Sequence, residues 1–384
     1  MFERTFFQGE PTFRHGEIPR LGVLLAFLGT PAAPTAAALR PYLGEFLSDK
    51  RVIELWQPAW KLILNGIILR TRPKKSAEAY EEVWTDEGSP LLLITERQTQ
   101  GIETRLREQI EQPLHVAFGA TYGHPSMASA LEKLRAEGCR RIVFLPLFPQ
   151  YSSTSSGAAF DAFARALMDL RWVPEVRTIM QYHDDPRYIA LLADRVRARW
   201  ADGGQPDKLV MSFHGIPQRY LENGDLYHCQ CHKTGRLVGE ALDLHPEQYQ
   251  VTFQSLFGRE EWIKPYTDRT LEAMARAGVQ QVDAMCPGFS ADCLETLEEI
   301  EGENREIFEE NGGSRFRYIP CLNDAPDHLD FLASLIRENM AGWLPADGGW
   351  DRAQAEAESA ASRTRAQTLM ACPARANAGY STAK

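Results

Sequence analysis

Residues 130–150, ALEKLRAEGCRRIVFLPLFPQ, decide the fold, because they align with residues 270–290, TLEAMARAGVQQVDAMCPGFS, without a gap. The offset is 140 residues, and it pairs Leu131 with Leu271 and Gly138 with Gly278. Each copy runs from an amphipathic stretch with helical spacing, through the glycine, into an apolar run typical of a strand. A match of this length favours duplication of one α/β unit over a chance likeness between two βα units.

The rest of the chain alternates short apolar runs with amphipathic stretches, a pattern typical of βα units around parallel sheets. We expect strands at seven runs: 22–29, 114–123, 140–150, 208–217, 249–258, 280–289 and 315–323. The sequence therefore predicts an α/β protein with two similar halves that face each other across a cleft. In such folds ligands bind outside the carboxyl ends of the strands.

Composition excludes several classes of protein. The 384 residues include 42 basic and 52 acidic side chains, and the net charge of -10 argues against nucleic acid as a partner. No apolar run approaches the roughly 20 residues that span a bilayer, and residues 1–13 do not resemble a secretory signal. Seven cysteines, an odd number, do not indicate a disulfide framework, so we expect a cytoplasmic protein. Residues 345–384 are rich in Ala, Ser, Arg and Gly and are expected to be mostly disordered.

Two turns become equivalent under the same offset. FPQYSSTSSG (148–157) corresponds to the turn that carries FSADCLET (289–296), so Ser155 falls opposite Glu295. One half thus offers hydroxyl groups to the cleft and the other offers carboxylates. Neither half contains G-x-G-x-x-G or G-x-x-x-x-G-K-[ST], so dinucleotide and P-loop sites lose their main support.

SFHGIPQRY (212–220) places His214 at the carboxyl end of an expected strand, just before a Gly-Ile-Pro turn. A histidine at this position can point into the cleft, where it is suited to acid–base or metal chemistry. A core histidine that bonds to the backbone is the alternative.

AMCPGFSADCLETLEEI (284–300) restarts after Pro-Gly as a helix rich in acid. Asp292, Glu295 and Glu299 follow the spacing i, i+3 and i+7, so they share one face of an α-helix. Glu298 and Glu301 lie off this stripe, and we expect them to be solvated. The stripe either faces water, as acidic helix starts often do, or faces His214, where a glutamate can exchange protons or help to hold a divalent metal.

YHCQCHKTG (227–235) contains residue types that bind metals: His228, Cys229, Cys231 and His232. Adjacent residues rarely converge on one ion, and zinc sites usually combine two separated pairs of ligands. The spacing of the other cysteines does not identify a second pair, so a metal or cluster site here stays a minor alternative.

WQPAWKLILNGIILRTRPKK (56–75) is an apolar stretch that ends in four cations. As a core helix it would be ordinary. Its density of large side chains also suits an apolar lip that meets a flat ligand with carboxylates, or a membrane surface.

Together FLGTP (27–31), FPQYSSTSSG, SFHGIPQRY, TFQSLFGREEWIKPYTDRTL (252–271) and CPGFSADCLETLEEI (286–300) resemble the ferrochelatases, in the order found in that family. The resemblance covers about residues 20–340 and is closest to the proteobacterial branch. It implies two Rossmann-like, chelatase-like domains with parallel sheets and a porphyrin cleft between them. We expect an extension at 1–19 and domains at 20–185 and 186–340, with the final helix packing back on the first domain.

The resemblance also implies an activity, the insertion of ferrous iron into protoporphyrin IX to give protoheme. It makes His214 and Glu295 the catalytic pair that handles pyrrole protons and metal, with Asp292 and Glu299 as an acidic path behind them. The residues expected to contact the porphyrin are Leu28, Trp60, Tyr122, Tyr151 and Ser152. Which of His214 and Glu295 first accepts a proton stays open.

Cofactors and partners follow from the same resemblance. Fe²⁺ is a substrate, and no resident cofactor is expected. Some family members bind a [2Fe–2S] cluster with a Cys-rich C-terminal extension, but here that extension holds only Cys372 and the QYSS turn has no Cys. We therefore do not expect the cluster, although Cys229 and Cys231 keep the alternative open. A monomer with peripheral membrane contact through the lip is expected. A chelatase for coproporphyrin or for a cobalt-accepting ring, and a binding protein without turnover, are the competing hypotheses.

Overall fold

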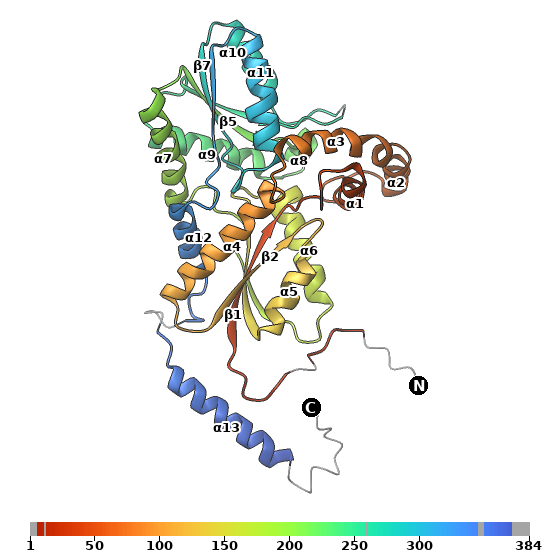
Figure 1. The fold of residues 1–384 in the computed structure, drawn as a ribbon, viewed down its shortest axis with the longest axis vertical. Helices are drawn as coiled ribbons and strands as arrows, with labels where there is room; N and C mark the ends of the chain where they lie inside the picture. Colours follow the sequence, from red (N-terminus) through yellow and green to blue (C-terminus); the bar gives the residue numbers. More distant parts are fainter. Residues whose placement is uncertain (1–5, 11–12, 259, 345–348, 371–384) are drawn as a thin grey trace.

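The computed structural model describes residues 6–10, 13–258, 260–344 and 349–370, and it contains two parallel β-sheets that lie one above the other in Figure 1. The strands of the first sheet, in the order β2-β1-β3-β4, are β1 (Arg20–Phe27), β2 (Leu114–Ala120), β3 (Cys139–Pro146) and β4 (Glu175–Thr178). Those of the second, in the order β6-β5-β7-β8, are β5 (Lys208–His214), β6 (Tyr249–Gln254), β7 (Gln281–Met285) and β8 (Arg315–Ile319). The identical order confirms the prediction of two similar α/β halves.

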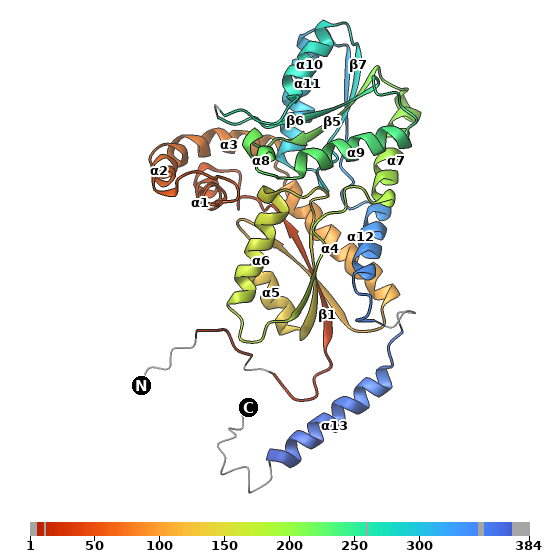
Figure 2. The same cartoon turned by 180° about the vertical axis from the view of Figure 1, so that it is seen from behind.

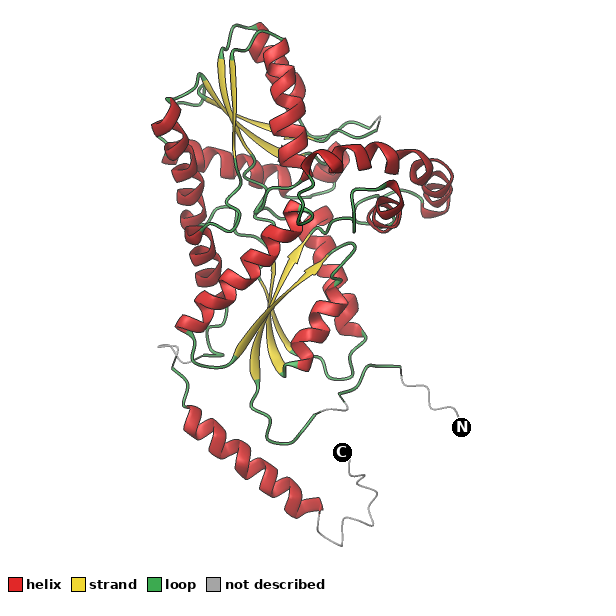
Figure 3. Ribbon diagram, viewed as in Figure 1, coloured by secondary structure: helices red, strands yellow, loops and turns green. Residues whose placement is uncertain are grey.

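Helices cover both faces of each sheet (Figure 3). The helices up to the middle of the chain are α1 (Ala36–Phe46), α2 (Gln57–Ile63), α3 (Leu69–Val83), α4 (Pro90–Gln109), α5 (Met127–Ala136), α6 (Ala158–Met168) and α7 (Pro186–Gly203). The later ones are α8 (Gln218–Glu222), α9 (Tyr227–Ala241), α10 (Thr267–Arg276), α11 (Asn304–Glu310), α12 (Pro326–Glu338) and α13 (Arg352–Met370). Three π-helical segments complete the chain: η1 (Leu64–Ile68), η2 (Ser153–Gly157) and η3 (Glu295–Glu303).

The strands form where the sequence is continuously apolar, because a parallel sheet is buried on both faces. In β1 every residue after Arg20 is buried, and Leu24 pairs with Ala117 of β2 and Phe144 of β3. Strand β4 is not among the seven expected strands. The strand lies at the edge of the sheet and is only partly buried. Its sequence, Glu-Val-Arg-Thr, therefore lacks the apolar run on which the expected strands were based.

The duplicated segments fold alike. Helices α5 and α10 begin at Met127 and Thr267, which are 140 residues apart. Each helix ends before a glycine in the left-handed region, Gly138 with φ 79° and Gly278 with φ 93°. A residue with a Cβ is disfavoured there, and glycine lets the chain turn directly into β3 or β7. Each half then continues into a π-helical segment, η2 after β3 and η3 after β7.

Helix α12 joins the halves, because it follows the second sheet in sequence and packs against α4 of the first half. Arg105 of α4 pairs with Asp330 of α12, and Gly101 leaves room for the Leu329 side chain. Buried Gln98 adds hydrogen bonds from its amide nitrogen to the carbonyls of Ser290 and Asn323 at 3.2 and 3.0 Å. These contacts hold the two sheets in one arrangement.

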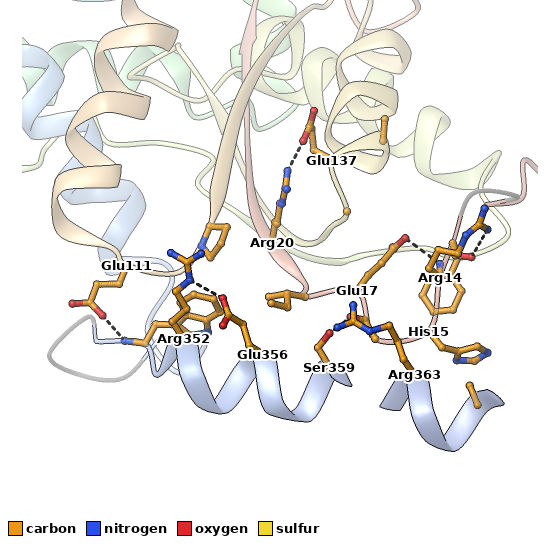
Figure 4. Close-up of a pocket in the computed structure, with 18 of the residues that line it drawn as sticks. Arg14, His15, Glu17, Arg20, Glu111, Glu137, Arg352, Glu356, Ser359 and Arg363 are labelled. Atoms are coloured by element: carbon orange, nitrogen blue, oxygen red, sulfur yellow. Dashed lines mark hydrogen bonds and ion pairs between the residues drawn. The ribbon is translucent and has the colours of Figure 1, made fainter. Parts of the chain in front are cut away.

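The C-terminal region differs from the expected disorder. Residues Arg352–Met370 form α13, whose alanines, glutamates and arginines are good helix formers. The helix lies beside residues 13–20, where Ser359 donates a hydrogen bond to the Gly16 carbonyl, and the two segments border an open groove of about 1390 Å³ (Figure 4). This groove lies at the amino ends of β1 and β3, opposite the ligand-binding edge. Residues 345–348 and 371–384, including Cys372, lie outside the described residues.

His328 of α12 makes the fold sensitive to acid. Its side chain is fully buried, Nδ1–H donates to the Asn323 carbonyl at 2.7 Å, and Nε2 has no hydrogen-bond partner. Burial lowers the pKa of His328 to about 4. The unfolded chain therefore binds a proton in a pH range where the folded chain does not, and stability falls as pH drops from about 6.5 to about 4.

We predict that this group alone lowers the free energy of unfolding by about 2 kcal/mol between pH 7 and pH 5. The variant His328→Asn, which keeps a donor near the Nδ1 position, should lose this dependence. Urea unfolding followed by circular dichroism at both pH values measures the difference. An unchanged pH dependence in the variant would contradict the assignment.

Candidate active site

His214 ends β5, beside the point where the chain crosses from β6 to β7 on the other side of β5. Ligands of open α/β sheets bind at such a crossing, outside the carboxyl ends of the strands. The His214 Nδ1 lies 2.6 Å from the Gly215 carbonyl oxygen, which can only accept, so Nδ1 carries the proton. This bond directs Nε2, the other ring nitrogen, away from the Gly215 carbonyl, and the ring centroid lies 6.2 Å from that of Trp262.

The acidic segment after β7 is a π-helix rather than the expected α-helix. Hydrogen bonds in a π-helix span five residues, so residues four or five apart, not three and seven apart, lie above one another. Glu295, Glu299 and Glu303 accordingly follow one side of η3. Glu301 forms an ion pair with Arg305 at 3.2 Å, outside this row.

Glu298 is not the solvated residue that the sequence predicted. It is half-buried, and burial together with the charges of neighbouring glutamates raises its pKa to about 7. Those neighbours are Glu82, Glu295, Glu299 and Glu303. Glu298 therefore belongs to an acidic cluster that includes Glu82 of the lip helix α3.

Glu299 is fixed at the end of β6, where Gln254 pairs in register with His214. Its carboxylate accepts hydrogen bonds from the Ser255 backbone N–H at 2.6 Å, the Ser255 hydroxyl at 2.5 Å and the Gln254 amide at 3.1 Å. Ser255 has φ 66°, a conformation that non-glycine residues rarely adopt and that aims its N–H at the carboxylate. Burial raises the pKa of Glu299, whereas these hydrogen bonds and the charge of His214 oppose the rise.

Glu295 faces the first half. Its backbone carbonyl accepts a hydrogen bond from Gln254 at 2.7 Å. Burial raises the pKa of Tyr42 and Tyr80, and the Glu295 charge adds to the effect. Burial lowers the pKa of Arg72 on α3, which the Glu295 charge opposes.

Leu28 and Glu295 line one small cavity of about 10 Å³ from opposite halves. The cavity holds at most one water molecule. Tyr80 and Val83 of α3 also line it. Segment 56–75 lies in the continuous helical run α2-η1-α3, beside the second half (Figures 1 and 2). The Arg72 guanidinium lies 4.3 Å above the Phe257 ring, so a cation–π contact holds this lip against the loop after β6.

Two expected porphyrin contacts lie in the core beneath the lip. Trp60 is 7% exposed, and its indole N–H donates to the Leu47 carbonyl at 2.6 Å. Tyr122 is 2% exposed, and its hydroxyl bonds to Asp49 at 3.0 Å. The large apolar side chains that the lip exposes are instead Leu55, Trp56, Leu62, Ile63 and Ile67.

Tyr151 and Ser152 lie where the turn after β3 meets the second half. The Tyr151 N–H donates to the Gln230 side chain at 2.7 Å, and the Ser152 hydroxyl bonds to Asp225 at 3.0 Å. The Ser152 oxygen also caps η2 by accepting from the Thr154 N–H. In this structure the turn fastens the halves together.

Asp292 is buried, and its carboxylate accepts four hydrogen bonds. It accepts hydrogen bonds from Tyr318 at 2.6 Å, Asn323 at 2.6 Å, the Cys321 N–H at 3.2 Å and Thr296 at 3.2 Å. These bonds tie the start of η3 to the end of β8. Asp292 thus positions the acidic helix, and its expected place on a metal path stays a prediction.

Gln254, Ser255 and Arg72 are site residues that single-residue reasoning missed. Gln254 and Ser255 directly follow the apolar run VTF (251–253). Polar residues at a strand end beside His214 were a usable signal, because a site there needs hydrogen-bond donors. Arg72 gave only a diffuse cationic signal. Within the described ranges, no three His, Cys, Asp or Glu side chains are arranged to hold a metal ion.

Comparison with known proteins adds to this geometry. The family model described as Ferrochelatase matches residues 20–340. The ferrochelatase of Thioalkalivibrio sulfidiphilus is 54% identical over 360 residues, covering 94% of this chain and 98% of that protein. The ferrochelatase of Chromobacterium violaceum is 55% identical over 334 residues, covering 87% and 92%.

Among solved structures, SirB from Bacillus subtilis with Fe3+ matches 84% of this chain and 97% of its own, at 11% identity and a TM-score of 0.48. The matched range of residues 20–340 includes both sheets, the lip, His214 and η3. The chain therefore belongs to the ferrochelatase family.

Proposed function

We propose that this enzyme inserts ferrous iron into protoporphyrin IX with His214 as the acceptor of pyrrole protons and Glu295 beside it at the metal. Membership of the ferrochelatase family supports the reaction. The observation that supports these roles is the arrangement of the side chains at the strand ends. His214 keeps Nε2 free, Glu299 lies within reach of its charge, and Glu295 meets the first half at the Leu28 cavity.

Metal insertion releases two N–H protons from the porphyrin for each iron that enters. A neutral imidazole accepts such a proton near neutral pH. The resulting imidazolium is stabilised by Glu299, whose own pKa is raised and which can pass the proton along η3 to Glu298. Carboxylates of the same row suit Fe²⁺, which accepts oxygen and nitrogen ligands.

The site must widen for this reaction, because a cavity of about 10 Å³ cannot hold a macrocycle, and we propose that α3, whose Tyr80 and Val83 line the cavity, moves outward. Small-molecule sites have volumes of roughly 300–1,000 Å³. Opening separates α3 from the loop after β6, so the contact between Arg72 and Phe257 breaks. The Arg72 cation, whose pKa burial lowers and the Glu295 charge raises, then moves away from Glu295 as the substrate arrives.

We predict that His214→Ala and Glu295→Gln each reduce the rate of heme formation at least ~100-fold, since a positioned acid or base contributes about 10²–10⁴. The matched control is Glu301→Gln, which removes a carboxylate from the same π-helix but outside the row. An anaerobic assay with Fe²⁺ and protoporphyrin IX measures the rates. Wild-type rates in both site variants would disprove the assigned roles.

The competing substrates differ in charge. Coproporphyrin carries four propionates, whereas the lip exposes apolar side chains. We predict a kcat/KM at least ~10-fold higher for protoporphyrin IX than for coproporphyrin, measured with Fe²⁺, Zn²⁺ and Co²⁺. A reversed preference would favour the coproporphyrin hypothesis, and binding without turnover would favour a carrier.

Fe²⁺ enters this proposal only as substrate, and we propose that the enzyme needs no resident cofactor. The turn after β3 has no cysteine that could hold an iron–sulfur cluster. Ser153, next to Ser152, accepts a hydrogen bond from Arg51 at 3.2 Å and offers no thiolate. Equal amounts of iron and acid-labile sulfide in the purified protein would contradict this.

We further propose a cytoplasmic monomer whose lip touches membranes peripherally. The site is built within one chain, and all described cysteines are free. In the described part of the chain no helix is long and apolar enough to cross a bilayer. Trp56, Leu62 and Ile67 are 75%, 77% and 61% exposed, close to the cations of α3.

The triple variant Trp56→Ser/Leu62→Ser/Ile67→Ser should lower binding to anionic vesicles at least ~10-fold in flotation assays, because the lip supplies the buried apolar area. Met168→Ser is the control, since Met168 is 74% exposed at the end of α6, away from the lip. Equal losses in both variants would contradict lip-specific contact.

A further inference from the structure

His228 and His232 of α9 form a pair that the proposed reaction does not use. They are four residues apart on one helix, so their side chains are neighbours on its surface. Their ring centroids lie 4.5 Å apart with an interplanar angle of 54°. Both side chains are half-buried, which leaves one edge of the pair accessible to solvent.

The surroundings of the pair favour neutral, oriented rings. Both rings pack on Phe253 of β6, with centroid distances of 5.4 Å for His228 and 5.8 Å for His232. Burial lowers the pKa of both histidines, and His228 lowers that of His232 further. An interaction with the Lys264 backbone opposes this lowering of the His228 pKa.

We infer that His228 and His232 bind one divalent transition-metal ion of the class that prefers imidazole, such as Zn²⁺, Ni²⁺ or Cu²⁺. Two histidines at i and i+4 on a helix are the geometry by which helical metal sites present two ligands. Metal-binding histidines commonly donate their second ring N–H to a carbonyl, and the Lys264 backbone lies beside His228. Water completes the coordination, because no third His, Cys, Asp or Glu of the described residues joins the pair.

This site is distinct from that of the reaction. Successive residues of a strand face opposite sides of the sheet. Phe253 faces α9 and the histidine pair, whereas the next residue, Gln254, faces Glu299 and η3. Cys229 lies about 100° around the helix from His228 and is exposed, so it stands outside the pair.

Isothermal titration of the chelator-treated protein with Ni²⁺ tests the inference. We expect His214→Ala, which weakens metal binding at the substrate site, to retain one Ni²⁺ site. Adding His228→Ala and His232→Ala to that background should abolish it. Each single substitution at the pair should weaken binding at least ~10-fold. Circular dichroism and thermal unfolding in metal-free buffer verify that each variant is folded.

Cu²⁺ electron paramagnetic resonance gives a second readout, since two imidazole nitrogens produce a hyperfine pattern that a single histidine does not. The controls are Cys229→Ser and His245→Ala, one beside the pair and one a separate exposed histidine. Both should retain the Ni²⁺ affinity and the Cu²⁺ spectrum. Unchanged stoichiometry in the His228/His232 variant, or loss of binding in Cys229→Ser, would overturn the inference.

Discussion

The hydrogen bonds that hold Glu299 at the end of β6 are the interaction on which the geometry of the site depends. A half-buried carboxylate is costly unless hydrogen bonds compensate for lost water. The Ser255 N–H, the Ser255 hydroxyl and the Gln254 amide supply three. Because Gln254 also holds the Glu295 carbonyl, one strand end fixes Glu295 and Glu299 relative to His214 on the neighbouring strand.

The duplication explains why the two halves build similar turns for different purposes. η2 and η3 follow equivalent strands, but the first carries serines and the second glutamates. The hydroxyl of Ser152 is small enough to be buried against Asp225, so the first turn fastens the halves together. The carboxylates of η3 repel one another and cannot all be buried in this way. They remain partly exposed, so a cation or a proton can neutralise them.

Much of this could be predicted from the sequence, because parallel strands and helix–glycine–strand units have strong local signals. The 140-residue offset located the paired sheets, and the strand before Gly215 located His214. The π-helix could not be predicted, because its acidic spacing also fits an α-helix. Glu298 was therefore assigned to solvent, although it lies in the acidic cluster.

The sequence also could not predict which single residues are buried. Trp60 and Trp56 belong to the same apolar stretch, yet one is 7% exposed and the other 75%. Only the packing of the lip on Leu47 distinguishes them. Likewise Asp292 and Glu299 looked equivalent on one stripe of the sequence. In the structure, Asp292 accepts hydrogen bonds from the end of β8, whereas Glu299 accepts hydrogen bonds from the end of β6.

In the proposed reaction, the raised pKa values along η3 would connect metal entry with proton release. Burial and nearby glutamates raise the pKa of Glu298 to about 7, and burial raises the pKa of Glu299 in the same direction. A divalent cation that enters this row supplies the opposite field, so it stabilises the ionised carboxylates and displaces their protons. In the proposed reaction, the same groups would attract iron and would recover the ability to accept protons once the ion had moved on to the porphyrin. A row of lysines would repel the ion, and fully solvated acids would hold no protons at neutral pH to exchange. Half-buried glutamates at the strand ends meet both requirements.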